Sequence, residues 1–252
     1  MIYRTLNIIY QRIFILIFVF CILIVCFSIY IVHANAIIFI QIDEFNNIET
    51  KLINIDTNKY SININYPSTK NKTVNQEINN FINYYIKKTE EDTKYFFPNT
   101  YNDKFNLNIN YECHRINKDI ISFIFLIKYS NNSALNSINI TTLSYNLKNG
   151  KEINLNSFFK GNSNYIVTLC NMSKKYLICS NTLDNKVLQF FIDDISYIGG
   201  KSFDGYSFSP NYISIYFNTN KISYEYNLIY EVKIPWKSVS DLLKNNVYLL
   251  EE

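Results

Sequence analysis

The stretch that decides the fold is LNINYECHRINKDIISFIFLIKY, residues 107–129. In its first part apolar and polar residues alternate from Leu107 to His114, which predicts a half-buried strand. Residues 117–119 predict a turn. The nearly unbroken apolar run of residues 120–129 then predicts a central strand that is covered on both faces. The stretch therefore predicts a hairpin of two long strands in mid-chain.

Helical spacing appears on both sides of this hairpin. Apolar residues recur at the helical period over residues 74–86, which predicts a helix with one face packed on the sheet. Thr73 and Gln76 have the spacing of a capping box at its start. A second helix is predicted over residues 166–177, and a short third one beginning near Pro235.

Further strands are predicted downstream of the hairpin, over residues 137–147, around Phe208, and over residues 212–217 and 227–234. In the first of these the apolar phase slips between Ile140 and Leu143, which predicts a β-bulge, and a tight turn with Asn-Gly follows it. Strands in consecutive runs with few helices are typical of an α+β fold. We expect a mainly antiparallel β-sheet with two or three packed helices.

The N-terminal region predicts export. Residues 13–32 contain no charged residue, basic residues precede them and acidic residues follow, so the N-terminus is expected to stay inside and the rest to be extracytoplasmic. Ala34 and Ala36 have the spacing that signal peptidase reads, which favours cleavage after Ala36 and a secreted or periplasmic product. The alternative is an uncleaved signal anchor, because the apolar run is about 20 residues long.

Composition limits the classes of partner. Residues 1–36 form the leader, and we divide the remainder into an N-terminal half, 37–134, and a C-terminal half, 135–246. Without the leader's two arginines, 24 − 2 = 22 basic residues face 21 acidic ones. A nucleic-acid partner is therefore not expected, since it needs a concentrated basic face.

The chain offers few residues for metal or acid–base chemistry. His114 is the one histidine beyond His33 in the leader. Cys113 and His114 are adjacent on a strand and point to opposite faces, so they cannot easily bind one ion. The segment at Gly161–Tyr165 lacks the second glycine of a nucleophile elbow. We expect no metal, no cofactor and no catalytic residue, and we interpret His114 as a solvent-facing strand residue.

Three cysteines follow the leader: Cys113, Cys170 and Cys179. Their odd count leaves at least one thiol outside any intramolecular pair. A bridge between Cys170 and Cys179 would require the second helix to end early, because nine helical residues separate two positions by about 13 Å along the axis. We interpret all three as buried or half-buried thiols.

Two segments resemble a known family. They are residues 142–159, TLSYNLKNGKEINLNSFF, and residues 217–236, FNTNKISYEYNLIYEVKIPW. Both are similar to segments of one domain family, which includes the extracytoplasmic domain of the lysozyme-binding anti-sigma factor RsiV and the non-catalytic region of the peptidoglycan deacetylase PdaC. Six residues of the second segment match without a gap: Phe217, Ile222, Glu231, Val232, Ile234 and Pro235. Asn218, Tyr224 and Leu228 replace the family's usual Asp, Pro and Gly.

The resemblance implies a ligand-binding surface. Many relatives carry a Gly-Ala-His type loop before the strand at Thr142, where this chain has SNNSALNSI, residues 130–138. An ordinary surface turn is the alternative interpretation of this segment. The residues predicted to contact a ligand are Asn131, Asn132, Ser133, Ala134, Leu135, Tyr224 and Tyr226. The anti-sigma role is not expected here, because only residues 1–12 precede the apolar run.

These features predict an exported, non-catalytic envelope module that binds a protein, peptidoglycan or a lysozyme-type ligand. A membrane partner is expected only through the N-terminal segment, if it is not cleaved. One alternative is an envelope polysaccharide deacetylase or hydrolase, which stoichiometric zinc would support. The other is a structural or assembly factor of the envelope, which would have no soluble ligand.

Overall fold

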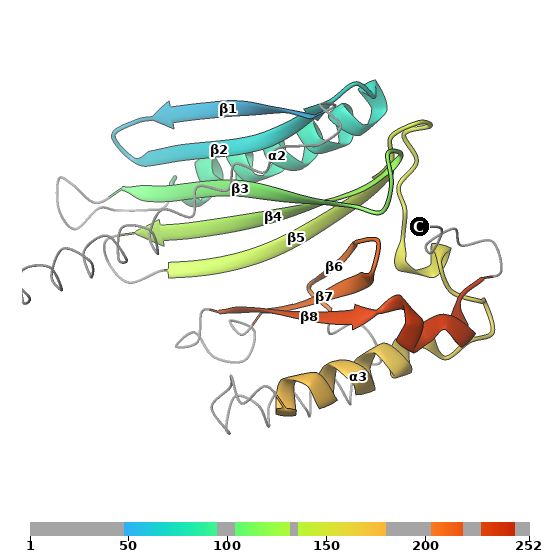
Figure 1. Ribbon diagram of the computed structural model, residues 1–252. Coiled ribbons are helices and arrows are strands. Elements are labelled where there is room, and N and C mark those ends of the chain that lie inside the picture. Colours follow the sequence, from blue (N-terminus) through green and yellow to red (C-terminus); the bar gives the residue numbers. More distant parts are fainter. Residues whose placement is uncertain (1–47, 95–103, 132–135, 180–202, 219–227, 245–252) are drawn as a thin grey trace, which may run out of the picture. The chain divides into compact units, whose positions relative to one another are not determined.

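The computed structural model describes residues 48–94, 104–131, 136–179, 203–218 and 228–244. All of them belong to one compact unit, residues 42–252. They form two β-sheets with helices packed on them (Figure 1), which confirms the predicted α+β class. Within these ranges no helix combines the length and the apolar character needed to cross a membrane.

The first sheet has five strands in the order β1-β2-β3-β4-β5. Neighbouring strands are antiparallel except β2 and β3, which are parallel because helix α2 returns the chain between them. The predicted hairpin is confirmed as β3 and β4. The bounds are β1 Ile48–Asp56, β2 Tyr60–Thr69, α2 Lys72–Asp92, β3 Phe105–Arg115, β4 Ile120–Asn131 and β5 Asn136–Asn146.

Helix α2 covers one face of this sheet. Its Val74, Ile78 and Ile82 are buried in a core with the apolar residues of β2, β3 and β4. The capping-box prediction is wrong, because Thr73 already lies inside the helix. The cap is Asn71, whose Oδ1 accepts hydrogen bonds from the N–H groups of Thr73 and Val74 at 3.0 and 3.2 Å.

Strand β5 has no bulge, contrary to the prediction. It pairs with β4 in unbroken register from Ser130 opposite Asn136 to Ile120 opposite Asn146. The apolar phase slips because both faces of β5 are covered: Tyr145 packs in the core under α2, while Ile140 packs on the opposite face with Tyr216. The domain boundary expected at residues 134/135 falls between these two paired strands.

The second sheet is antiparallel, with the order β6-β7-β8. Helix α3 and a 3-10 helix cover one of its faces, around a core that contains Trp236. The short helix predicted near Pro235 is thus confirmed in place, with the tighter 3-10 geometry. The bounds are α3 Tyr165–Cys179, β6 Gly205–Phe208, β7 Tyr212–Asn218, β8 Ile229–Pro235 and the 3-10 helix Trp236–Leu242.

In the part of the chain that the structure describes, Cys113, Cys170 and Cys179 are thiols and form no disulfide bond with one another. Cys113 and Cys170 are buried, in the cores of the first and second sheet respectively. Cys179 is exposed, so the interpretation of all three as buried or half-buried is wrong for this one. Helix α3 continues as far as Cys179, which is why a bridge to Cys170 does not form.

Candidate functional site

The seam between the two sheets is built from hydroxyl groups. Edge strand β6 points two backbone N–H groups at the first sheet: Tyr206 donates to Thr142 Oγ1 at 2.9 Å, and Phe208 donates to Ser122 Oγ at 3.0 Å. Ser122 also bonds Ser144 at 2.8 Å, between β4 and β5. These bonds satisfy strand groups that would otherwise be buried without partners, and they explain the serine in the apolar run of β4.

A chain of polar side chains continues from this seam. His114 Nδ1 lies 2.9 Å from Ser207 Oγ, which lies 3.0 Å from Tyr216 Oη. Glu231 ends the chain: its Oε1 accepts from Tyr216 Oη at 3.4 Å and from Ser214 Oγ at 2.6 Å. Strand alternation makes this possible, because it places His114 on the face of β3 opposite the α2 core.

The carboxylate sets the direction of the protons in this chain. Tyr216 donates its single proton to Glu231, so it must accept from Ser207. Ser207 in turn accepts from His114, which places the imidazole proton on Nδ1. The other ring nitrogen, Nε2, is then an acceptor.

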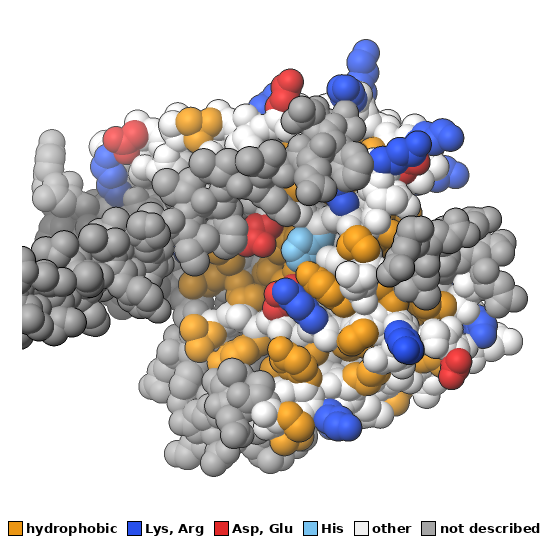
Figure 2. Space-filling model, in the orientation of Figure 1, with side chains coloured by type: hydrophobic (Ala, Val, Ile, Leu, Met, Phe, Trp, Pro, Cys, Tyr) orange, Lys and Arg blue, Asp and Glu red, His pale blue; other side chains and the backbone are white. Residues whose placement is uncertain are grey.

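Charges beside the chain perturb its titratable groups. Burial lowers the pKa of His114, and the opposing effect of Glu231 is smaller. Burial, followed by repulsion from Glu231, raises the pKa of Glu112 on the same face of β3. Attraction to Glu231 raises the pKa of Lys233, whose Nζ lies 3.5 Å from Glu231 Oε2. Figure 2 shows a histidine with acidic and basic side chains around it on this face.

This hydrogen-bonded row of side chains contains the groups of acid–base chemistry, but it does not contain an accessible nucleophile. A neutral imidazole with an acceptor nitrogen suits a general base. The hydroxyl beside it belongs to Ser207, which has no exposed surface and already bonds two partners. In this conformation a substrate cannot reach it, and the network joins the two sheets. Within the described ranges no group of three or more His, Cys, Asp or Glu residues is placed to hold a metal ion.

The solvent-facing interpretation of His114 is wrong. The residue is half-buried, because β6 packs against β3 over this end of the strand. The sequence gives no signal for this contact, since the partner on β6 lies 93 residues away and has no distinctive motif.

An open apolar hollow of about 280 Å³ lies between α3 and β8. Its lining includes Met172, Tyr176, Ile234 and Pro235, with Lys175 and Lys233 beside them. Tyr176 is 48% exposed. A concave apolar and aromatic lining with a few charged groups is typical of ligand-binding surfaces, and the sequence analysis missed this site.

Most of the predicted ligand-contact residues cannot be compared with the structure. Asn131 is the last residue of β4 and is buried. Residues 132–135, Tyr224 and Tyr226 lie outside the described residues, as do Ala34 and Ala36 of the predicted cleavage site.

Comparisons with known proteins identify the fold. No family model and no curated protein matches the chain. A solved structure of a DUF3298 family protein from Pseudomonas aeruginosa matches with a TM-score of 0.59 and 10% sequence identity, covering 81% of this chain and 96% of that one. A DUF3298 family member from Bacteroides fragilis matches with a TM-score of 0.50 and 15% identity, covering 80% and 95%. The chain has the DUF3298 fold. At these identities the likeness concerns the DUF3298 fold alone and assigns no activity.

Proposed function

We propose that the chain is an exported, non-catalytic module that binds an envelope ligand, either a protein or peptidoglycan. One observation carries the proposal. The side chains suited to acid–base chemistry, His114 and Ser207, are hydrogen-bonded to each other between the two sheets, whereas the open hollow beside α3 has an apolar and aromatic lining of the kind that binds ligands. The hydroxyl next to His114 belongs to a residue without exposed surface, whereas Tyr176 at the hollow is half exposed.

The resemblance to the RsiV and PdaC domains supports the choice of ligand class. RsiV binds a lysozyme, and PdaC is itself a peptidoglycan deacetylase, so both resemblances point to the cell wall. An aromatic ring with flanking lysines suits either the apolar face of a glycan strand or an apolar protein anchor. The predicted loop residues Asn131–Leu135, Tyr224 and Tyr226 remain candidates for further contacts.

Binding of the detergent-solubilised full-length chain to purified peptidoglycan and to immobilised lysozyme tests this function. We expect binding to one of the two, and at least a five-fold loss of affinity for Tyr176→Ala. Tyr84→Ala is the matched control, because Tyr84 is a 58% exposed tyrosine on α2, outside the hollow. No binding to either ligand at high protein concentration refutes the module. Binding that Tyr176→Ala leaves unchanged places the contact elsewhere.

Export has its own test. Protease added to spheroplasts, from which any outer membrane and the cell wall have been removed, should digest the domain. N-terminal sequencing of the protein from untreated cultures should give either the intact start or a new start after Ala36. Full protection from protease in spheroplasts, together with digestion after lysis, would refute an extracytoplasmic location.

A further inference from the structure

Three turns meet at one end of the first sheet. They are residues 70–72, which lead into α2, residues 115–119 from the last residue of β3 to the start of β4, and residues 147–151 after β5. Hydrogen bonds join them: Asn71 Nδ2 donates to the Leu147 carbonyl at 2.9 Å, and the Leu147 N–H donates to the Asp119 carbonyl at 2.6 Å. Segments far apart in the sequence therefore form one surface, which we call the basic end.

The basic end carries an excess of positive charge. Its three turns hold one acidic residue, Asp119, and six basic ones: Lys70, Lys72, Arg115, Lys118, Lys148 and Lys151. Two more carboxylates, Glu77 and Glu152, lie close enough to act on Tyr145, which still leaves six positive charges against three negative. Figure 2 shows basic side chains gathered here, at the upper right.

The lysines of the basic end surround an open hollow. Lys70, Lys118 and Lys148 line a space of about 350 Å³ together with Asp119. All three lysines are exposed, and none makes an ion pair with another part of the described chain. Their charges are therefore available to an external anion.

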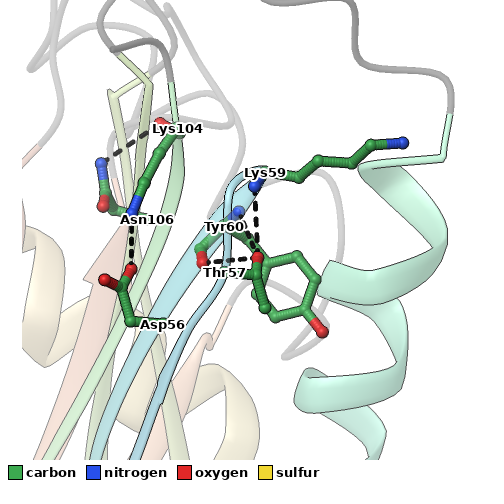
Figure 3. A network of polar contacts seen from close by, with 6 residues as sticks. All are labelled: Asp56, Thr57, Lys59, Tyr60, Lys104 and Asn106. Carbon is green, nitrogen blue, oxygen red and sulfur yellow. Dashed lines mark hydrogen bonds and ion pairs between the residues drawn. The ribbon is translucent and has the colours of Figure 1, made fainter. Parts of the chain in front are cut away.

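The opposite end of the same sheet has no such excess. Lys104 there pairs with Asp56 at 2.8 Å, as Figure 3 shows, and the last turn of α2 carries Glu90, Glu91 and Asp92. Strand β4 runs from one end to the other over 12 residues, which is roughly 36 Å at about 3.3 Å per residue. The first sheet is thus charged asymmetrically along its strands.

The chain enters the domain at the basic end. Ile48, the first described residue, is opposite Thr69, which directly precedes Lys70. Residues 33–47 connect Ile48 to the apolar run of residues 13–32, and such a length of chain spans at most roughly 50 Å. If the run stays in the membrane, the end nearest to its tether is the one rich in lysine.

We propose that residues 13–32 remain as an anchor and that the basic end docks on an anionic phospholipid surface. Lysines are attracted to anionic headgroups within about a Debye length, about 10 Å at 0.1 M salt. The tether keeps the domain within reach of the bilayer, so weak attraction suffices. Docking turns the opposite end, where Asn131 lies, away from the membrane and toward the cell wall.

Lysine acetylation of the full-length chain in nanodiscs tests the docking. A water-soluble reagent is applied in discs of phosphatidylcholine alone or with phosphatidylglycerol, and each lysine is quantified by mass spectrometry. We expect Lys70, Lys118 and Lys148 to react at least three-fold more slowly in the anionic discs, and this protection to disappear in 1 M salt. The controls are Lys59 and Lys94, exposed lysines toward the opposite end, whose rates should not change.

Variants separate docking from a general effect of the anchor. Lys118→Glu with Lys148→Glu should abolish the protection of Lys70, while Lys59→Glu with Lys94→Glu should preserve it. Emission of the buried Trp236 checks that both variants are folded.

Three outcomes overturn the proposal. They are equal rates at the basic end in both kinds of disc, protection by soluble polyphosphate without protection by anionic discs, and a mature cellular protein that begins at Ile37. The second would assign the hollow to a soluble phosphate polymer. None of these measurements involves peptidoglycan or lysozyme, so the result stands apart from the binding function.

Discussion

His114 on β3 and Ser207 on β6 are 93 residues apart in the chain, and their side chains meet with 2.9 Å between Nδ1 and Oγ. This contact joins the end of the first sheet to the edge of the second. It also removes the imidazole from water, and the pKa of His114 falls from its ordinary value of 6.5. A half-buried titratable group between two sheets makes their association sensitive to pH.

The free energy of unfolding should therefore fall in mild acid. Above pH 6.5 His114 is neutral in both the folded and the unfolded chain, so its contribution is fully present. Below 6.5 the unfolded chain takes up a proton that the folded chain resists, and stability is lost as the pH falls through the lowered folded pKa. His114→Gln should flatten this part of the profile, measured by denaturant titration of Trp236 emission. An unchanged slope between pH 7 and 5 would contradict the buried neutral imidazole.

The contribution of Glu112 to the free energy of unfolding should change with pH in the opposite direction. Burial and repulsion from Glu231 raise its pKa above 4.5, so the folded chain holds its proton more tightly than the unfolded chain. Its contribution is present below pH 4.5 and lost as the pH rises through the raised folded pKa. Glu112→Gln should therefore be more stable than the wild type at pH 8, and this advantage should vanish near pH 4. Glu91→Gln, an exposed glutamate on α2, should show no such change.

The hairpin of β3 and β4 and the helix α2 follow from local patterns that the sequence displays. Strand β3 alternates with period two, β4 is a continuous apolar run, and α2 has a single apolar stripe, so each element shows which of its faces is buried. Their pairing then follows from a short turn at residues 117–119.

The site could not be predicted, because it arises between elements. Ser122 looks like an interruption of an apolar strand until Phe208, 86 residues later, supplies the N–H that it accepts. His114 looks solvent-facing until β6 covers it. The hollow beside α3 is lined by Tyr176 of α3 and Ile234 of β8. The apolar periods of the sequence predict this helix and this strand one at a time, but they do not predict that the two lie side by side.

Ser122 should be a costly position to change. Ser122→Ala leaves the buried N–H of Phe208 without its acceptor and Ser144 without its partner, and an unsatisfied buried group costs about 1–3 kcal/mol. Ser238→Ala is the control, because Ser238 is exposed, and it should change stability by less than about 0.5 kcal/mol. Denaturant titration of both variants compares them directly. Equal stabilities would mean that the seam does not depend on this hydroxyl.

The cysteines should differ sharply in reactivity. A maleimide applied to the native full-length chain should label exposed Cys179 within minutes, while Cys113 and Cys170 should react at least ten-fold more slowly because both are buried. Peptide mapping by mass spectrometry assigns the label to each residue. In denaturant all three should react at similar rates. Early labelling of Cys170 in native conditions would show that α3 separates readily from the second sheet.

A close approach between the two sheets, at Gly205 of β6 and Thr142 of β5, predicts a steric coupling. A Cβ atom at Gly205 would lie 2.7 Å from Thr142 Cγ2 and 2.9 Å from Thr142 Oγ1. Gly205→Ala must therefore push β6 away from β5, and such overpacking costs about 1–3 kcal/mol. Gly161→Ala should be nearly neutral, because no atom lies within 4 Å of its added methyl group.

A double-mutant cycle distinguishes this clash from a backbone effect. Thr142→Ser removes the Cγ2 methyl and keeps the hydroxyl that accepts from the Tyr206 N–H, so it should recover part of the loss caused by Gly205→Ala. A favourable coupling energy of at least about 0.5 kcal/mol is expected for residues in direct contact. If the two changes in the free energy of unfolding are strictly additive, the cost of Gly205→Ala does not come from a clash with Thr142. The close approach of β6 to β5 would then not be the cause of the lost stability.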